Sequence, residues 1–320
     1  MNLQYSFIIP VYNRPDEVGE LLDSLLIMEG GISFEVVIVE DGSSNTCAHI
    51  LEKYQKVLNI RYFFTENRGA GKSRNFGMQQ ASGNYFLILD SDCLVPKDYL
   101  IHVNSQLKSN FTDAFGGPDA AHESFTSVQK AINYAMTSVF TTGGIRGKKK
   151  AIGKFQPRSF NFGLSKKAFE KTKGFSDLKI GEDIDLTFRL WETGFETQLI
   201  EAAFVYHKRR ANFRQFFKQT NNFGKARPIL NKRYPGTAKI TYWFPSVFLV
   251  GFVLACLFFT TNSMILMYAY ASYFSILLID ATLNNKSLKV GLLSLIATAV
   301  QFYGYGTGFL YSTISSKKKP

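Results

Sequence analysis

The chain has 320 residues, of which 46% are hydrophobic and 19% are charged, and this length corresponds to about two domains. Cys47, Cys93 and Cys256 are far apart in the sequence, which excludes a disulfide scaffold and the ligand spacing of a zinc ribbon. The formal net charge of +12 leads us to expect an anionic partner, namely a nucleotide, a nucleic acid or a lipid headgroup.

The N-terminal part of the chain alternates between predicted strands and predicted helices. Short runs rich in Ile, Val, Phe and Tyr predict strands over residues 7–11, 35–39, 60–64 and 85–89. Helical patterns lie between them, beginning at Pro15 and covering residues 48–57 and 71–81. This alternation predicts an α/β fold with a mostly parallel sheet, whose ligands bind beyond the carboxyl ends of the strands.

A polar cluster follows each of these strands, at residues 12–15, 40–44, 66–69 and 90–92. Each cluster taken alone also fits an ordinary turn. Because the carboxyl ends of parallel strands share one rim of the sheet, four clusters in succession predict a shared site. Asp90 and Asp92 flank a single residue at a strand end, and their oxygens suit a hard divalent cation such as Mg²⁺ or Mn²⁺.

Two further segments carry charged candidates. Arg68 and Arg74 lie where glycines open the third predicted helix, so we expect them to neutralise phosphate or to orient Asp41; an arginine-capped loop is the alternative. Glu182 and Asp183 begin a predicted helix that runs to about residue 191. Acidic residues in a first turn often only complement the helix dipole, so this pair alone does not indicate catalysis.

A basic segment links the two halves of the sequence. Residues 208–233 contain nine Lys or Arg, and aromatic residues recur among them at helical spacing. This pattern predicts a helix that lies on anionic lipid, with a helix that packs on a domain as the alternative. Nucleic acid is not expected as a partner, because hydrophobic runs of membrane type follow directly.

Three apolar runs end the chain, over residues 242–262, 264–279 and 290–314. The first has the length that spans a bilayer, and basic residues place the first two as a hairpin with cytoplasmic ends. A full span of the third run would place the three lysines that follow it on the outer side of the membrane, which conflicts with the preference of basic residues for the cytoplasm. The glycines at 304, 306 and 308 would instead allow a bent or re-entrant segment, and the sequence is compatible with either arrangement. No signal-peptide pattern is present at the start, so we expect the soluble part in the cytoplasm of a multi-pass membrane protein.

Four motifs carry a resemblance to a known family: FIIPVYNR at 7–14, VEDGS at 39–43, DSD at 90–92 and GEDIDL at 181–186. In this order and spacing they resemble glycosyltransferase family 2 over roughly residues 3–230. The resemblance implies a GT-A fold and an inverting, metal-dependent transferase that uses a nucleotide-sugar donor.

The resemblance also implies roles for individual residues. Asp183 would be the catalytic base, with Glu182 beside it, and Asp92 the direct metal ligand. Asp90 would face the ribose or reach the metal through water, and His207 would complete the metal site or touch the diphosphate, unless it is an ordinary strand-end histidine. The donor would contact Pro10, Val11, Tyr12, Asn13, Asp41, Arg68, Arg74, Asp90, Ser91, Gly117 and Asn161. Residues 141–150, rich in glycine and lysine, would close over the donor or meet an anionic acceptor; a solvated loop fits equally well.

These features together predict three parts: a GT-A domain over residues 1–207, a basic interfacial segment over 208–240 and a membrane domain over 241–320. The expected activity is transfer from a nucleotide-sugar, with UDP-sugar favoured, to a hydroxyl of a lipid-linked or cell-envelope saccharide. A polyprenyl-phosphate glycosyltransferase is the alternative, although a phosphate acceptor needs no base. A processive synthase is disfavoured because no Gln-x-x-Arg-Trp motif is present, and a non-catalytic adaptor is disfavoured by the intact Asp92 and Asp183.

Overall fold

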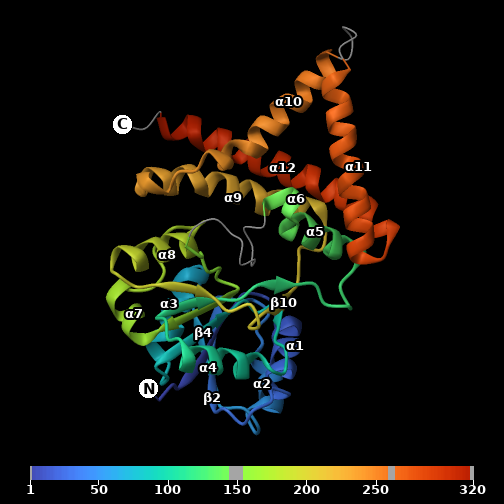
Figure 1. Ribbon diagram of the computed structural model, residues 1–320. Coiled ribbons are helices and arrows are strands. Elements are labelled where there is room, and N and C mark those ends of the chain that lie inside the picture. The colour runs from blue at the N-terminus through green and yellow to red at the C-terminus, as the bar shows by residue number, and fades with distance from the viewer. Residues whose placement is uncertain (1, 144–153, 259–263, 318–320) are drawn as a thin grey trace. The chain divides into compact units, whose positions relative to one another are not determined.

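In the computed structural model, which describes residues 2–143, 154–258 and 264–317, the chain divides into two compact units (Figure 1). The first unit comprises residues 1–122 and 146–208, and the second comprises residues 123–145 and 209–320. The second unit therefore includes a segment that lies between the two parts of the first unit in the sequence, which the sequence did not indicate. The three-part division expected from the sequence stays a prediction.

The first unit is built on a seven-stranded sheet in the order β3-β2-β1-β4-β8-β6-β9. Strands β1 to β4 are parallel to one another, β8 is antiparallel to β4 and to β6, and β9 is parallel to β6. The predicted α/β architecture with a mostly parallel sheet is thus confirmed. The strands are β1 (Tyr5–Val11), β2 (Phe34–Asp41), β3 (Ile60–Thr65), β4 (Tyr85–Leu89), β6 (Ala114–Gly116), β8 (Asn161–Ser165) and β9 (Thr197–Leu199).

Two apolar cores hold helices against the two faces of this sheet. Side chains alternate between the faces of a strand, so Phe7 and Ile9 of β1 lie in one core and Ile8 lies in the other. The first core includes residues of α1 (Pro15–Leu26), α2 (Ala48–Tyr54) and α4 (Tyr99–Ser109). The second includes residues of α3 (Ala70–Gln80), α7 (Lys166–Thr172) and α8 (Glu182–Glu192).

A small second sheet lies in the same unit, in the order β5-β10-β7, with β5 at Cys93–Leu94, β10 at Val205–His207 and β7 at Asp119–Ala120. The antiparallel pairing of β10 with β5 sets His207 opposite Cys93, and the N–H of Lys208 donates to the carbonyl of Asp92 at 3.0 Å. This pairing brings a strand from late in the unit to the end of β4.

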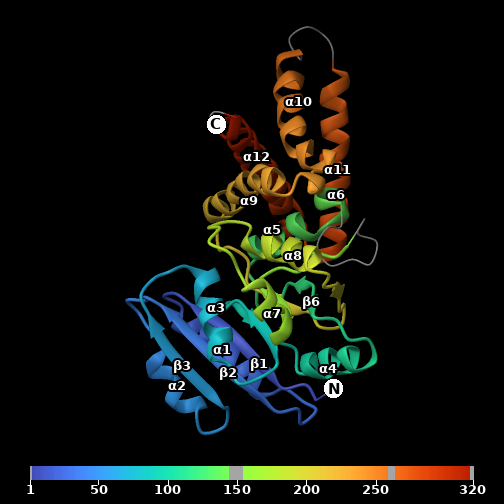
Figure 2. The same ribbon diagram turned by 90° about the vertical axis from the view of Figure 1, so that its left-hand side faces the viewer.

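The second unit is helical. It contains α5 (Ser127–Thr137), α6 (Val139–Thr142), α9 (Phe213–Arg233), α10 (Phe244–Phe258), α11 (Ile265–Asn285) and α12 (Leu288–Lys317), with short 3₁₀ turns at Pro235–Thr237 and Ile240–Trp243. Helices α10 and α11 run as a hairpin, while α9 lies beside α12 (Figures 1 and 2). Among the described residues, three segments are long and apolar enough to cross a membrane: Ile240–Leu257, Ile265–Asn285 and Leu288–Ser315.

The glycines of the third apolar run serve close packing and not a break in the helix. Residues 288–317 form one continuous helix, so the glycines do not interrupt it, and the choice between a full span and a re-entrant segment stays a prediction. A Cβ on Gly304 would lie 2.1 Å from the Thr220 hydroxyl of α9, and a Cβ on Gly308 would lie 2.2 Å from the Asn221 carbonyl. Gly224 of α9 faces the Tyr305 carbonyl in the same way, at 2.2 Å.

The basic segment forms α9 as predicted, but its two faces differ. Phe216, Thr220 and Leu230 are buried, whereas Arg214 and Lys218 are exposed. Not all basic residues of the segment are exposed: Arg209, which precedes α9, is buried, and its guanidinium donates to the Asn133 side chain of α5 at 2.9 and 3.1 Å. The helix therefore packs on α12 and still presents cations to its surroundings.

Candidate active site

The carboxyl ends of β1 and β2 are tied together by Asn13. This residue has a left-handed backbone (φ 53°), and its side-chain oxygen accepts hydrogen bonds from the Ser44 hydroxyl at 3.1 Å and the Asn45 N–H at 2.9 Å. Its own N–H donates to the Ser43 hydroxyl at 2.8 Å. Asparagine tolerates this backbone region better than most residues, so the turn and the tie come from the same side chain.

Asp41, at the end of β2, organises the start of α3. Its carboxylate accepts from the N–H groups of Arg68 and Gly69, at 2.8 and 3.0 Å, and from the Ser73 hydroxyl at 2.9 Å. A carboxylate offers about four acceptor positions, so roughly one remains for a ligand. Gly42 has a positive φ, and a Cβ there would lie 2.5 Å from the Asn67 nitrogen, which explains the glycine after Asp41.

Arg74 is buried and joins two acidic motifs that are far apart in the sequence. Its guanidinium donates to Asp90 at 2.7 Å and to Glu182 at 3.1 Å. The expectation that Arg74 orients Asp41 is therefore wrong, because its side chain is occupied by these two carboxylates. Arg68 does contact Asp41, but through its backbone, while its guanidinium lies 5.3 Å from the centre of the Phe76 ring.

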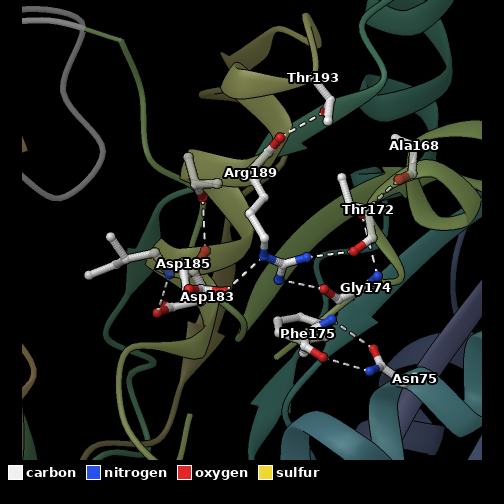
Figure 3. A network of polar contacts seen from close by, with 11 residues as sticks. Asn75, Ala168, Thr172, Gly174, Phe175, Asp183, Asp185, Arg189 and Thr193 are labelled. Atoms are coloured by element: carbon white, nitrogen blue, oxygen red, sulfur yellow. Dashed lines mark hydrogen bonds and ion pairs between the residues drawn. The ribbon is translucent and has the colours of Figure 1, made fainter. Parts of the chain in front are cut away.

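Helix α8, which carries Glu182 and Asp183, is fixed by a buried ion pair (Figure 3). Arg189 donates to the buried Asp185 carboxylate at 2.9 Å and to the carbonyls of Thr172 and Gly174, both at 2.6 Å. The Asn75 amide of α3 adds two hydrogen bonds to the backbone of Phe175, both at 2.8 Å. These contacts join α8 to the segment 172–175, and Asn75 joins that segment to α3, the helix that carries Arg74.

The two acids of that first turn have different surroundings. Burial raises the pKa of Glu182, the neighbouring Asp183 raises it further, and Arg74 opposes the rise without cancelling it. The Asp183 carboxylate accepts a hydrogen bond from the N–H of Ile184 at 2.8 Å, which fixes it at the helix N-terminus. Glu182 thus faces the interior arginine, and Asp183 is held beside it.

Asp92 is buried between a histidine and an arginine. The Nε2 atom of His207 lies 3.2 Å from one carboxylate oxygen, and Arg14 contacts the other. Burial alone would raise the pKa of Asp92, but the attraction of His207 and Arg14 outweighs it and holds this pKa well below its usual range. His207 Nε2 is also 4.0 Å from Asp90, so Asp90, Asp92 and His207 face one another.

The donor set at this point fits a divalent metal. Ligand atoms of Asp92, Cys93 and His207 all lie within 4.8 Å of one another. The Cys93 thiol donates to the Phe160 carbonyl at 3.5 Å, and thiolate suits softer metals than Mg²⁺ or Mn²⁺, so we leave it out of the donor set. Asp92 and His207 remain from this set, and Asp90, 4.0 Å from His207, adds a second carboxylate. Mn²⁺ or Mg²⁺ accepts such ligands when a diphosphate supplies further oxygens.

The remaining predicted donor contacts have mixed surroundings. Tyr12 is 53% exposed at the rim, whereas Val11 and Ser91 are buried and Pro10 is partly buried. Asn161 is fully buried, accepts from the Tyr99 hydroxyl at 2.7 Å and donates to the Ala203 carbonyl at 2.7 Å, an arrangement that supports the strand and favours an indirect role. A Cβ on Gly117 would lie 1.8 Å from that same carbonyl. Residues 144–150 of the predicted flexible loop lie outside the described residues.

Sequence reasoning missed three residues of this cluster. Arg14 was noted only as part of a motif, Ser73 was not considered, and Cys93 was recorded only as an isolated cysteine. The register of β5 with β10 sets Cys93 opposite His207, and no local signal in either segment encodes that pairing. The signal for Arg14 was available in principle, because it directly follows the turn residue Asn13.

Comparison with known proteins gives matches in sequence and in fold. The family model described as "Glycosyl transferase family 2" matches residues 6–173, more than half of the chain. Poly(ribitol-phosphate) beta-N-acetylglucosaminyltransferase TarS from Staphylococcus aureus is 38% identical over 101 residues, which cover 31% of this chain and 18% of TarS. The poly-beta-1,6-N-acetyl-D-glucosamine synthase of Staphylococcus epidermidis is 30% identical over 190 residues, covering 58% of this chain and 45% of the synthase.

Solved structures support the same fold. The crystal structure of TarS 1–349 in complex with UDP-GlcNAc aligns with a TM-score of 0.51 and 19% identity, covering 98% of this chain and 92% of that one. The mannosyltransferase PcManGT from Pyrobaculum calidifontis, in complex with GDP-Man and Mn²⁺, aligns with a TM-score of 0.64 and 15% identity, covering 95% and 88%. The GT-A fold is thereby confirmed. The chain spans less than half the length of each of these two curated relatives.

Proposed function

Because the chain belongs to glycosyltransferase family 2, we propose that it moves a sugar from a UDP-sugar to a hydroxyl of a lipid-linked or cell-envelope saccharide, with inversion and with a divalent metal. The observation that carries the proposal is the chain of contacts from Asp92 through His207 and Asp90 to Arg74 and Glu182. It joins the metal motif to the motif of the base. The names of both relatives refer to N-acetylglucosamine, so UDP-GlcNAc is the first donor to test.

The donor would lie along the rim of the parallel strands. Tyr12 is exposed there, and the acceptor position that Asp41 retains suits the ring N–H of uracil. The diphosphate would reach Asp90, Asp92 and His207, which would hold the metal. When bound, a divalent cation would offset the negative charge that develops on the departing nucleotide. The protein's own part is to keep these three side chains facing one another before the donor arrives.

Asp183 would accept the proton of the acceptor hydroxyl. A carboxylate in this role must be held in place, and the N–H of Ile184 in the first turn of α8 holds the Asp183 carboxylate. Glu182, with its raised pKa, would act as a positioning group through Arg74. Attack by the hydroxyl on the face of the sugar opposite the nucleotide would give inversion.

The membrane arrangement is the second part of the proposal. Helices α10 and α11 would span as a hairpin, with the basic ends and the catalytic unit in the cytoplasm. Helix α12 packs along α9, so both would lie at the cytoplasmic interface, which keeps its terminal lysines on that side. The exposed Arg214 and Lys218 of α9 would then meet anionic headgroups.

Two assays test the proposal with the full-length protein. Membranes from overexpressing cells, supplied with UDP-sugars, should transfer sugar to a chloroform-soluble or polymeric acceptor, and a chelator should abolish transfer. Transfer unaffected by a chelator would contradict the metal role, and a product labile as a sugar phosphate would indicate a phosphate acceptor. Reconstitution in nanodiscs should show higher activity with anionic than with neutral lipid, and Arg214→Gln with Lys218→Gln should remove that difference, whereas Lys53→Gln should not.

A further inference from the structure

Arg14 is the charged group that completes the surroundings of Asp92. It contacts one carboxylate oxygen of Asp92, while His207 lies at the other. The Asp92 side chain is 8% exposed and that of Arg14 is 33% exposed, so the aspartate is fixed in the interior and the arginine reaches it from the rim. A cationic side chain therefore occupies an oxygen that a divalent metal would also use.

The backbone of Arg14 is held independently of this contact. Asn13, in its left-handed conformation, is bonded to Ser43, Ser44 and Asn45, and Arg14 itself caps the N-terminus of α1. The tip of a long side chain can change partner while such a backbone stays in place. The turn therefore fixes the backbone of Arg14, while its long side chain can still reorient at the rim.

The charges around Asp92 call for such a movable cation. Asp90, Asp92, Glu182 and Asp183 are four carboxyl groups, and the nitrogen-bearing groups that face them are the guanidinium groups of Arg14 and Arg74 and the imidazole of His207. Arg74 is buried and engaged with Asp90 and Glu182, so it is not available to move. Arg14 also lies near Glu17 and Asp90, which together with Asp92 raise its pKa despite its burial and keep it charged. A divalent cation would add two positive charges to this cluster, and a nucleoside diphosphate would then add new negative charge at the rim.

We propose that Arg14 is a positioning residue that neutralises Asp92 in the absence of metal and turns to the donor diphosphate when metal and donor bind. This inference rests on the proposed function, because it assumes that Asp92 holds a metal next to a diphosphate. It predicts two effects of opposite sign for a single substitution. Loss of Arg14 removes a competitor of the metal, and it also removes a contact to the donor.

The test uses the full-length protein in detergent and Mn²⁺ as the probe. Mn²⁺ binding is determined without nucleotide, from the free Mn²⁺ that electron paramagnetic resonance detects. UDP binding is then measured separately at saturating Mn²⁺. We expect Arg14→Gln to bind Mn²⁺ about tenfold more tightly than the wild type, and UDP about tenfold more weakly; tenfold corresponds to about 1.4 kcal/mol. Arg14→Lys keeps the charge but not the planar fork, so its affinities for Mn²⁺ and for UDP should lie between those of the wild type and of Arg14→Gln. Lys53→Gln removes an exposed, paired cation far along the chain from Asp92 and should change neither value.

A purely structural role of Arg14 predicts a different pattern. In that case Arg14→Gln would bind Mn²⁺ equally or more weakly, and this result, in protein with unchanged circular dichroism, would overturn the inference. In the presence of a chelator, Arg14→Gln should melt at a lower temperature than Lys53→Gln, because Asp92 then loses one of its two partners. Equal melting temperatures would also overturn the inference.

Asp92→Asn separates this inference from the proposed function. If Asp92→Asn loses Mn²⁺ binding while Arg14→Gln changes nothing, only the role of Arg14 is wrong. If wild type and Asp92→Asn bind Mn²⁺ equally, the metal site itself is wrong, and the role of Arg14 is rejected with it.

Discussion

Substitution of Arg74 by methionine tests how the two acidic motifs are held together. The Arg74 side chain is 4% exposed, and its partners Asp90 and Glu182 are 28% and 19% exposed. Methionine keeps much of the side-chain volume but leaves both carboxylates without a cation. Removing one partner of a buried pair costs about 3–5 kcal/mol. The partial exposure of both acids reduces the penalty here, so we expect a loss of about 3 kcal/mol in the free energy of unfolding.

This loss should be visible as a melting temperature lower by roughly 6–12 °C, measured by thermal denaturation of the full-length protein in detergent at neutral pH. The difference should shrink on acidification, because the stranded carboxylates then take up protons. Glu182→Gln in the Arg74→Met background should restore part of the stability, since it removes one unpaired charge. Lys72→Met is the matched control: its partner Asp177 is 86% exposed, so the change should be at most about 1 kcal/mol.

A melting temperature of Arg74→Met within about 2 °C of the wild type would refute this reasoning. So would a double variant that is less stable than Arg74→Met alone. Either result would mean that the bridge from Asp90 to Glu182 does not stabilise the site, and that the two motifs are positioned by the packing of α3 and α8 instead.

Three other outcomes are expected. Asp183→Asn should keep UDP binding but lower the rate of transfer by about 10²–10⁴, as measured in the membrane assay, and full turnover in this variant would exclude Asp183 as the base. Since the pKa of Asp92 is lowered in the folded protein, its ion pairs stabilise the fold above the ordinary aspartate pKa of about 4, and this stability is lost as the pH falls further. Between pH 5 and pH 2 the melting temperature of the metal-free wild type should therefore fall by more than that of Asp92→Asn. Parallel profiles of melting temperature against pH would contradict this. Gly224→Ala should destabilise the packing of α9 on α12 by about 1–3 kcal/mol. Gly236→Ala should be neutral, because no atom lies within 4 Å of the added Cβ. Equal melting temperatures of the two variants would show that the helices can move apart at no cost.

The sequence was sufficient for the parallel half of the sheet, because each of those strands has an apolar run and a polar end. Strand β4 at Tyr85–Leu89 was predicted with its observed bounds, and β1 and β2 differ only at their ends. The convergence of Asp41, Asp90 and Asp92 on one rim followed from the rule that parallel strands share their carboxyl ends.

The parts that were not predicted depend on contacts between distant segments. The pairing of β10 with β5 and the choice of Asp90 and Glu182 as partners of Arg74 are set by tertiary packing, which leaves no periodic signal. The same applies to residues 123–145, which form α5 and α6 in the helical unit; there Tyr134 donates to Asp280 of α11 at 2.6 Å. The glycines of α12 had a visible pattern, but only the opposing Thr220 and Asn221 show that it serves packing.

The most direct test of the account is pulsed electron paramagnetic resonance of Mn²⁺ bound to the full-length protein together with UDP. The account predicts that one population of Mn²⁺ couples both to ³¹P of the diphosphate and to ¹⁴N of the His207 imidazole. His207→Ala should remove only the ¹⁴N coupling, and Asp92→Asn should remove the bound species. If ³¹P coupling appears without ¹⁴N coupling in the wild type, or if Asp92→Asn gives an unchanged spectrum, the strand ends do not assemble the metal and diphosphate site described here.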